Sequence, residues 1–118
     1  MKYLKTLALS SIILLTAISC KKNPYPGYDK TDNGLYYKFH ISSESKEKPK
    51  FGDFLTVDMV YRTETDSIIY DSRMRPVPVL LPLDSSLYKG DILEGLGMLS
   101  LGDSATFIQP ADSFFKYF

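Results

Sequence analysis

The chain has 118 residues, with 14 basic side chains, 14 acidic side chains and one histidine, so its formal net charge at pH 7 is zero. A chain of this length forms at most one domain. The balanced charge produces no field that would attract nucleic acid, and a hydrophobic content of 44% is too high for a disordered protein. The composition therefore predicts one small folded domain and argues against a nucleic-acid-binding protein.

The first 20 residues resemble the signal sequence of a bacterial lipoprotein. Lys2 and Lys5 precede an apolar run that is shorter than the ~20 residues needed to cross a bilayer. The run leads to AISC at residues 17–20, which resembles a lipobox. We expect residues 1–19 to be removed and Cys20, the only cysteine, to be lipidated and to anchor the chain in a membrane. An ordinary signal peptide that contains a cysteine is the alternative.

The segment that follows has the composition of a tether. Residues 20–33, CKKNPYPGYDKTDN, are polar, contain two prolines and a glycine, and show no apolar period. From Gly34 onward the chain carries strand patterns, which fall at residues 34–41, 54–63, 68–72, 79–84 and 104–110. The clearest is 54–63, where apolar and polar residues alternate as in a half-buried strand. Pro82 predicts an edge strand or a strand end.

One helix is predicted, over residues 91–98. Gly95 and Gly97 each destabilise this helix by roughly 1 kcal/mol relative to alanine, so packing has to hold it in place. The Gly-Asp pairs at residues 52–53 and 102–103 predict turns rather than calcium loops. Short strands with one brief helix indicate an antiparallel α+β domain, and no element is predicted for residues 111–118.

The residue types present predict chemistry that needs no cofactor. The single histidine, His40, and the single cysteine cannot form a cluster with metal-ligand spacing. No serine lies in a nucleophile-elbow motif, and no glycine-rich loop has the phosphate-binding pattern. We therefore expect no metal and no cofactor, and we interpret His40 as structural.

Three segments in order resemble the FKBP-type peptidyl-prolyl cis-trans isomerases. They are PKFGDFLTVDMVY, then DSIIYDS, then GDILEGLGMLSLGDSATFIQPADSFF, and the resemblance covers residues 34–118. It implies an antiparallel sheet wrapped around one short helix. It also implies rotation about X-Pro bonds in an apolar pocket, with proline-containing polypeptides as clients.

The resemblance also implies site residues. Tyr70 matches the aromatic residue and Asp71 the carboxylate of the family's catalytic pocket. The other positions on which pocket residues of the family fall are Met59 or Tyr61, Val79, Leu81, Ile92, Phe114 and Phe115. Val60 is a further alternative for the position shared by Met59 and Tyr61.

The sequence departs from the family in ways that bear on activity. Ile92 falls near a pocket-floor tryptophan that this chain lacks, small aliphatic residues replace a wall aromatic, and Phe114 or Phe115 replaces a tyrosine hydroxyl. The sequence given stops at Phe118, where the family continues into a last strand. We expect a fragment of a longer product; the alternatives are a strand borrowed from a partner, or poor folding.

Two functions follow from these observations. The first is a prolyl isomerase, lipid-anchored through Cys20 in the Gram-negative envelope, which assists the folding of exported proteins. Lys21 after the cysteine favours the outer membrane, facing the periplasm. The second is a catalytically weak FKBP-like chaperone or protein-interaction domain.

Overall fold

A computed structural model describes residues 23–117 of the chain. The expected signal peptide and Cys20 lie outside the described residues. The elements in chain order are β1 (Asp29–Lys30), β2 (Tyr36–Ile41), β3 (Phe54–Val57), β4 (Val60–Arg62), β5 (Ile68–Asp71), the 3-10 helix η2 (Ser72–Met74), β6 (Val79–Pro82), α2 (Ile92–Leu96), β7 (Ser104–Ile108) and α3 (Ala111–Tyr117). Residues 23–117 form a small α+β fold with antiparallel strands and two short α-helices, which confirms the predicted α+β class.

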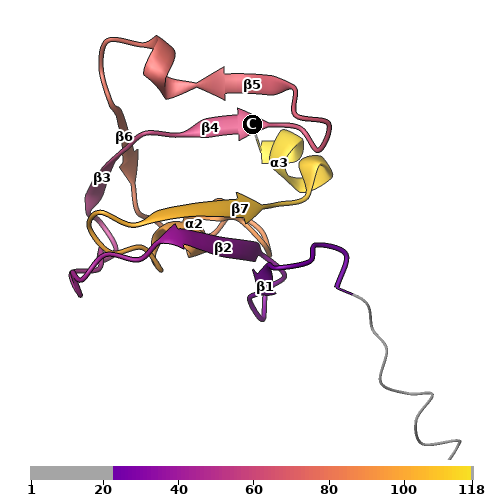
Figure 1. Cartoon of the computed structure of the whole chain (residues 1–118), viewed down its shortest axis with the longest axis horizontal. Helices are drawn as coiled ribbons and strands as arrows, with labels where there is room; N and C mark the ends of the chain where they lie inside the picture. The colour runs from indigo at the N-terminus through magenta and orange to yellow at the C-terminus, as the bar shows by residue number, and fades with distance from the viewer. Residues whose placement is uncertain (1–22, 118) are drawn as a thin grey trace, which may run out of the picture.

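The strands form three small antiparallel sheets. The largest has the order β1-β2-β7, and two further pairs are β3 with β6 and β4 with β5. Within residues 23–117, β4 pairs only with β5 and β7 only with β2. Figure 1 shows β4 and β7 running in the same direction. Each of these two strands therefore keeps one edge without a strand partner in the described part of the chain.

Helix α2 lies against β7 through a contact that requires glycine at position 95. A Cβ atom at Gly95 would lie 2.7 Å from Cδ1 and 2.9 Å from Cζ of Phe107, closer than side-chain carbons approach one another. Leu96, the next residue, is buried, as are Leu35 and Leu83. The glycine that weakens α2 in isolation is therefore the residue that allows the helix to pack on the sheet.

The strand predicted over residues 54–63 is divided into β3 and β4, so that prediction is wrong in its continuity. The break lies at Met59, whose backbone N–H donates to the Ser72 hydroxyl at 2.8 Å, while the Ser72 N–H donates to the Met59 carbonyl at 3.0 Å. A side-chain oxygen thus replaces a backbone carbonyl in the ladder. The apolar alternation nevertheless continues through the break, because Leu55, Val57 and Tyr61 are all half-buried.

The last described residues form helix α3, which the sequence analysis missed. Pro110 precedes the helix and its carbonyl accepts a hydrogen bond from the Phe114 N–H at 3.1 Å. Asp112 lies in the first turn and Lys116 in the last, and both charges complement the helix dipole. The expectation of a sheet around one helix is therefore too simple, because α3 is a second helix and the strands form separate sheets (Figure 1).

Part of the segment expected to be a tether is folded. Strand β1 pairs with β2, and the turn after β1 is closed by hydrogen bonds from the Leu35 N–H to the Thr31 hydroxyl and from the Thr31 N–H to the Leu35 carbonyl. The proline and glycine content that indicated a linker instead supplies the turns that lead into a strand of only two residues.

Both Gly-Asp pairs lie in turns, as predicted. Gly52 and Gly102 have φ angles of 91° and 88°, which glycine adopts without strain. The carboxylates of Asp53 and Asp103 accept the N–H of the residue three positions earlier, at 2.8 and 2.9 Å. Pro82 is the last residue of β6, in agreement with the predicted strand end.

We expect Gly95→Ala to lower the free energy of unfolding by about 1–3 kcal/mol, because the new methyl group overpacks the Phe107 ring. Gly97→Ala is the matched control, since its nearest neighbour, the Glu94 carbonyl oxygen, lies at an ordinary 3.5 Å. Urea denaturation measures both. Equal effects of the two substitutions would contradict the packing argument, as would failure of Phe107→Leu to restore part of the stability lost in the Gly95→Ala chain.

Candidate functional site

Four aromatic side chains from β4, β5 and α3 form an aromatic cluster, consisting of Tyr61, Tyr70, Phe114 and Phe115. Tyr61 and Tyr70 are cross-strand partners whose ring centroids lie 6.2 Å apart. The Tyr61 ring also lies 5.6 Å from Phe114, which packs edge-on against Phe115 at 5.2 Å. All three segments that carry the resemblance thus contribute rings to one cluster, although Tyr61 and Phe114 are more than fifty residues apart in the sequence.

Tyr61 and Tyr88 are held in their neutral, hydrogen-bond-donating form. Burial raises the pKa of Tyr61, and the nearby Asp91 carboxylate and Tyr70 raise it further. Burial, Asp91 and Tyr61, in that order, raise the pKa of Tyr88 to about 12. The Tyr88 hydroxyl donates to Oε1 of Gln109 at 2.8 Å, and its ring stacks on Tyr117 at 5.5 Å. The hydroxyl of Tyr61 is therefore a potential donor to a substrate carbonyl.

Asp91 links this group to helix α2. Its side chain is 1% exposed and caps the helix, because its carboxylate accepts the N–H of Leu93 at 3.3 Å and that of Leu87 at 2.9 Å. Gln109 Oε1 also accepts the N–H of Ile92 at 3.3 Å. The residue that begins the helix is thus the one whose charge acts on Tyr61 and Tyr88.

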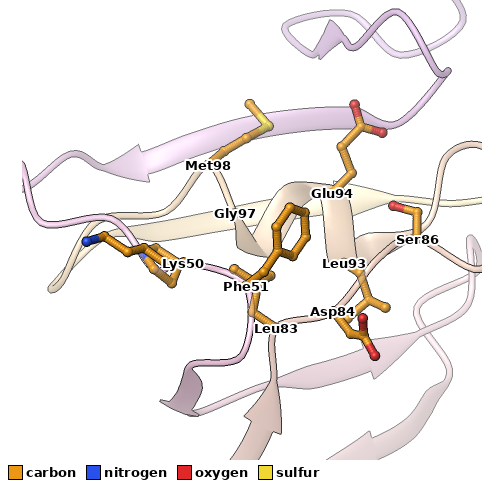
Figure 2. A pocket seen from close by; sticks show the side chains of 10 residues that line it. Lys50, Phe51, Leu83, Asp84, Ser86, Leu93, Glu94, Gly97 and Met98 are labelled. Carbon is orange, nitrogen blue, oxygen red and sulfur yellow. The ribbon is translucent and has the colours of Figure 1, made fainter.

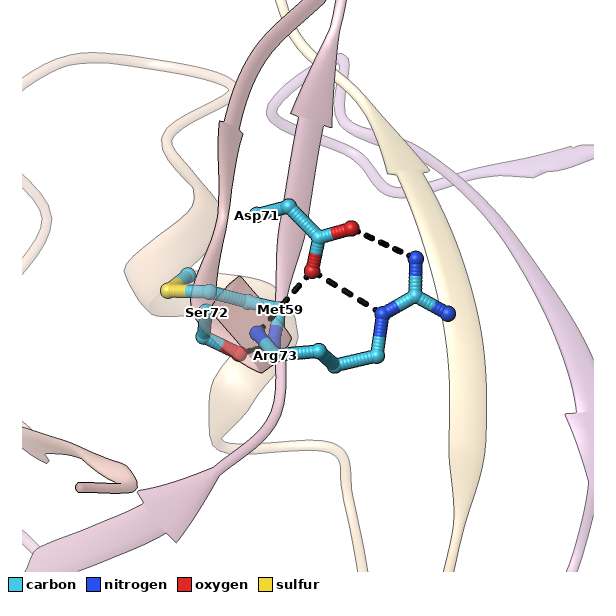
Figure 3. A network of polar contacts seen from close by, with 4 residues as sticks. All are labelled: Met59, Asp71, Ser72 and Arg73. Carbon is cyan, nitrogen blue, oxygen red and sulfur yellow. Dashed lines mark hydrogen bonds and ion pairs between the residues drawn. The ribbon is translucent and has the colours of Figure 1, made fainter. Parts of the chain in front are cut away.

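Arg73 binds the carboxylate of Asp71, the residue that follows Tyr70 at the end of β5 (Figure 3). Its carboxylate accepts the Nε–H and NH2 groups of Arg73 at 2.9 and 2.6 Å, and also the Arg73 backbone N–H at 3.0 Å. These hydrogen bonds lower the pKa of Asp71 to about 2. The Arg75 guanidinium lies 5.3 Å from the Tyr70 ring centroid, which adds a cation–π contact on the same strand end. Asp71 is therefore ionised, with both oxygens engaged, at neutral pH.

The remaining predicted pocket residues are dispersed. Val79 and Leu81 lie on β6, where they pair with Val57 and Leu55 of β3. Met59 takes part in the strand break through its backbone, so that Tyr61 is the member of that pair of alternatives that joins the aromatic cluster. Of the predicted site residues, Tyr61, Tyr70, Phe114 and Phe115 come together as the aromatic cluster, whereas Asp71 follows Tyr70 at the end of β5 and binds Arg73.

A cavity of about 540 Å³ lies elsewhere, between α2, the segment before β3 and the segment after β6 (Figure 2). Apolar groups from Phe51, Leu83, Leu93 and Met98 line it, together with the polar side chains of Lys50, Asp84, Ser86 and Glu94. None of the predicted pocket residues lines this cavity. The sequence predicts only structural roles for the turn around Phe51 and for the end of α2.

The sequence analysis missed three polar residues around the cluster, namely Arg73, Tyr88 and Gln109. A local signal existed for Arg73, because a basic residue two positions after an aspartate can pair with it in a turn. Asp91, directly before an apolar helical segment, carried the usual signal of a helix cap. Tyr88 and Gln109 meet only through tertiary structure, and no sequence pattern connects them.

No family model matches this chain, and no curated protein matches it either. Among residues 23–117, no group of three His, Cys, Asp or Glu side chains lies close enough together to hold a metal ion. In the same part of the chain, no helix has the length and apolar character needed to cross a membrane. The function is therefore argued from the aromatic cluster and its surroundings.

We expect Arg73→Gln to raise the pKa of Asp71 toward its ordinary value of 3.8. The lowered pKa stabilises the native chain above pH 3.8, and this contribution disappears as the pH falls through about 2. The Arg73→Gln chain should therefore lose less stability than the wild type between these pH values, as measured by urea denaturation and by NMR titration of Asp71. Lys46→Gln is the control, because Lys46 is exposed and is not among the groups that shift the pKa of Asp71. An unchanged Asp71 titration in the Arg73→Gln chain would refute the assignment.

The raised pKa of Tyr88 predicts that the stability of the native chain also depends on pH in the alkaline range. Because folding raises its pKa from 10.0 to about 12, its contribution to stability is complete below pH 10 and is lost as the pH rises toward 12. Tyr88→Phe keeps a ring that can stack on Tyr117 but removes the titrating hydroxyl, so the alkaline loss of stability should be smaller. Denaturation curves recorded across this range test the prediction, and identical profiles for the two chains would disprove it.

Proposed function

We propose that this chain is a peptidyl-prolyl cis-trans isomerase of the FKBP type, anchored through Cys20 in the Gram-negative envelope, where it assists the folding of exported proteins. The observation that carries the proposal is the aromatic cluster. In this cluster the ring centroid of Tyr61 lies 6.2 Å from that of Tyr70 and 5.6 Å from that of Phe114. Each of the three residues comes from a different one of the three segments that carry the resemblance. The proposed site binds a proline ring of a client polypeptide against these rings.

The chemistry required is within reach of such a surface. Rotation about an X-Pro bond is slow because the amide has partial double-bond character, with a barrier of roughly 18–20 kcal/mol. An apolar surface removes water from the amide, which disfavours the planar, charge-separated ground state more than the twisted transition state. A neutral Tyr61 hydroxyl, whose pKa burial raises, can donate to the carbonyl of the twisted amide. No proton has to leave the protein.

Asp71 acts in this proposal as a fixed negative charge at the rim of the cluster. Its three hydrogen bonds from Arg73 hold the carboxylate at the end of β5, at the position that follows Tyr70. A charge that does not titrate near neutral pH leaves the site electrostatics constant across physiological conditions. The proposed activity should accordingly be independent of pH around neutrality.

A second function, a catalytically weak FKBP-like chaperone or interaction domain, is favoured by exposed apolar side chains. Met74, Phe51 and Leu101 are 85%, 78% and 73% exposed. Where such apolar groups gather into one contiguous patch, the surface is typical of those that bind unfolded chains or protein partners. In this alternative the same aromatic cluster would hold clients without accelerating proline isomerisation.

We expect the full chain to accelerate cis-trans exchange of a proline tetrapeptide in a protease-coupled assay. Tyr70→Leu should lower kcat/KM about tenfold, because it removes one ring of the proposed binding surface. Ile69→Leu is the matched control on the same strand, since Ile69 is 56% exposed and lies outside the cluster; it should leave the rate unchanged.

The same preparations discriminate between the two functions. A rate equal to uncatalysed exchange, together with suppressed aggregation of a heat-denatured client, would favour the chaperone over the isomerase. A catalysed rate that Tyr70→Leu and Ile69→Leu change equally would show that the aromatic cluster is not the site.

A further inference from the structure

A second surface, distant from the aromatic cluster in sequence, combines lysine and tyrosine side chains. We call it the lysine–tyrosine face and define it by Tyr25, Tyr28, Lys30, Tyr36 and Lys38. Tyr25 packs edge-on against Tyr28 and Tyr36, with centroids 6.5 and 4.8 Å apart. Lys30 Nζ lies 5.6 Å from the centroid of Tyr36, and Lys38 Nζ lies 5.8 Å from that of Tyr28. Five side chains therefore form one continuous set of contacts.

The register of the sheet places positive groups on this face. Tyr36 and Lys38 project to one side of β2 by alternation, and Lys30 is the β1 partner of Tyr36. His40 follows on the same side, because its Nε2 contacts the hydroxyl of Thr106, the β7 partner of Lys38. The opposite side of β2 carries Tyr37 and Phe39.

Acidic groups are kept off the strands of this face. Asp29 pairs with Tyr37 and so belongs to the other side of the sheet, and Asp32 lies in the turn after β1. Within the described residues neither Lys30 nor Lys38 forms an ion pair with a carboxylate. Their charges are therefore available to an external anionic partner.

The position of the face in the chain points to a lipid surface. Its first residue, Tyr25, lies five residues after Cys20, and Lys21 and Lys22 stand between them. Five residues span at most about 18 Å even when fully extended, so an anchored Cys20 keeps the face close to the membrane. Tyrosine rings favour the boundary between headgroups and acyl chains, and lysines near an anionic surface are attracted to it.

From these observations we infer that the lysine–tyrosine face rests on the anionic lipid surface of the membrane to which the chain is anchored, and so fixes the orientation of the domain. This inference rests on the lipid anchor of the proposed function, but not on isomerase activity. In this orientation, the side of the sheet that carries Tyr37 and Phe39 faces away from the lipid.

The chain contains no tryptophan, so a single introduced tryptophan reports directly on lipid contact. We expect Tyr28→Trp, in the full chain produced in a Gram-negative host, to be quenched by brominated acyl chains in phosphatidylcholine vesicles containing phosphatidylglycerol. Phe51→Trp, in a loop outside the face and 78% exposed, should not be quenched. Tyr25→Trp is a second reporter in case the first substitution disturbs the fold.

Charge variants test the electrostatic part of the inference. Lys30→Gln combined with Lys38→Gln should reduce the quenching at position 28 to the level of Phe51→Trp. Lys46→Gln combined with Lys89→Gln makes the same charge change on exposed residues outside the face and should leave the quenching intact. Vesicles of phosphatidylcholine alone, or high salt, should reduce the quenching at position 28 as the Lys30→Gln/Lys38→Gln pair does.

Several results would overturn the inference. They are equal quenching of the reporters at positions 28 and 51, absence of quenching at both 25 and 28, or quenching that does not depend on anionic lipid. Binding of a single-stranded oligonucleotide that the Lys30→Gln/Lys38→Gln chain loses, without lipid contact, would identify a nucleic-acid surface instead. Mass spectrometry of Cys20 tests the anchor separately, and the tetrapeptide assay tests the isomerase without a membrane.

Discussion

The contact between the Phe107 ring and the bare backbone of Gly95 is the constraint on which the rest of the structure depends. Strand β7 contains Phe107, which packs against helix α2. The residue directly after the strand, Gln109, accepts hydrogen bonds from the Ile92 N–H and the Tyr88 hydroxyl. Helix α2 in turn is capped by Asp91, whose charge acts on Tyr61. The register of a single strand therefore sets the helix, and through the helix it sets the electrostatics of the aromatic cluster.

Much of this arrangement could be predicted from the sequence where the signals are local. The apolar alternation before Tyr61, the helix around Gly95 and the turns at Gly52 and Gly102 all depend on neighbouring residues, and they occur as predicted. The division of the strand at Met59 could not be predicted in the same way. It depends on the hydroxyl of Ser72, which lies thirteen residues further along the chain, and no residue near Met59 predicts this contact.

The same distinction separates the parts of the candidate site. Asp71 and Arg73 pair across two residues and belong to a local turn, whereas Tyr88 and Gln109 are brought together by tertiary packing. Helix α3 was missed for a related reason: its seven residues carry three aromatic rings, which have only modest helix propensity. Contact of Phe114 with Tyr61 contributes to holding this helix, and sequence alone does not show that contact.

The free edges of β4 and β7 have a consequence for how the molecule behaves in solution. Because both strands run in the same direction, an extended segment that forms an antiparallel ladder with either of them has to run in the opposite direction (Figure 1). An edge of unpaired backbone groups is also a template for an edge on another copy. Association of copies through these edges would therefore increase with protein concentration. The fold of the single chain is best observed in dilute solution.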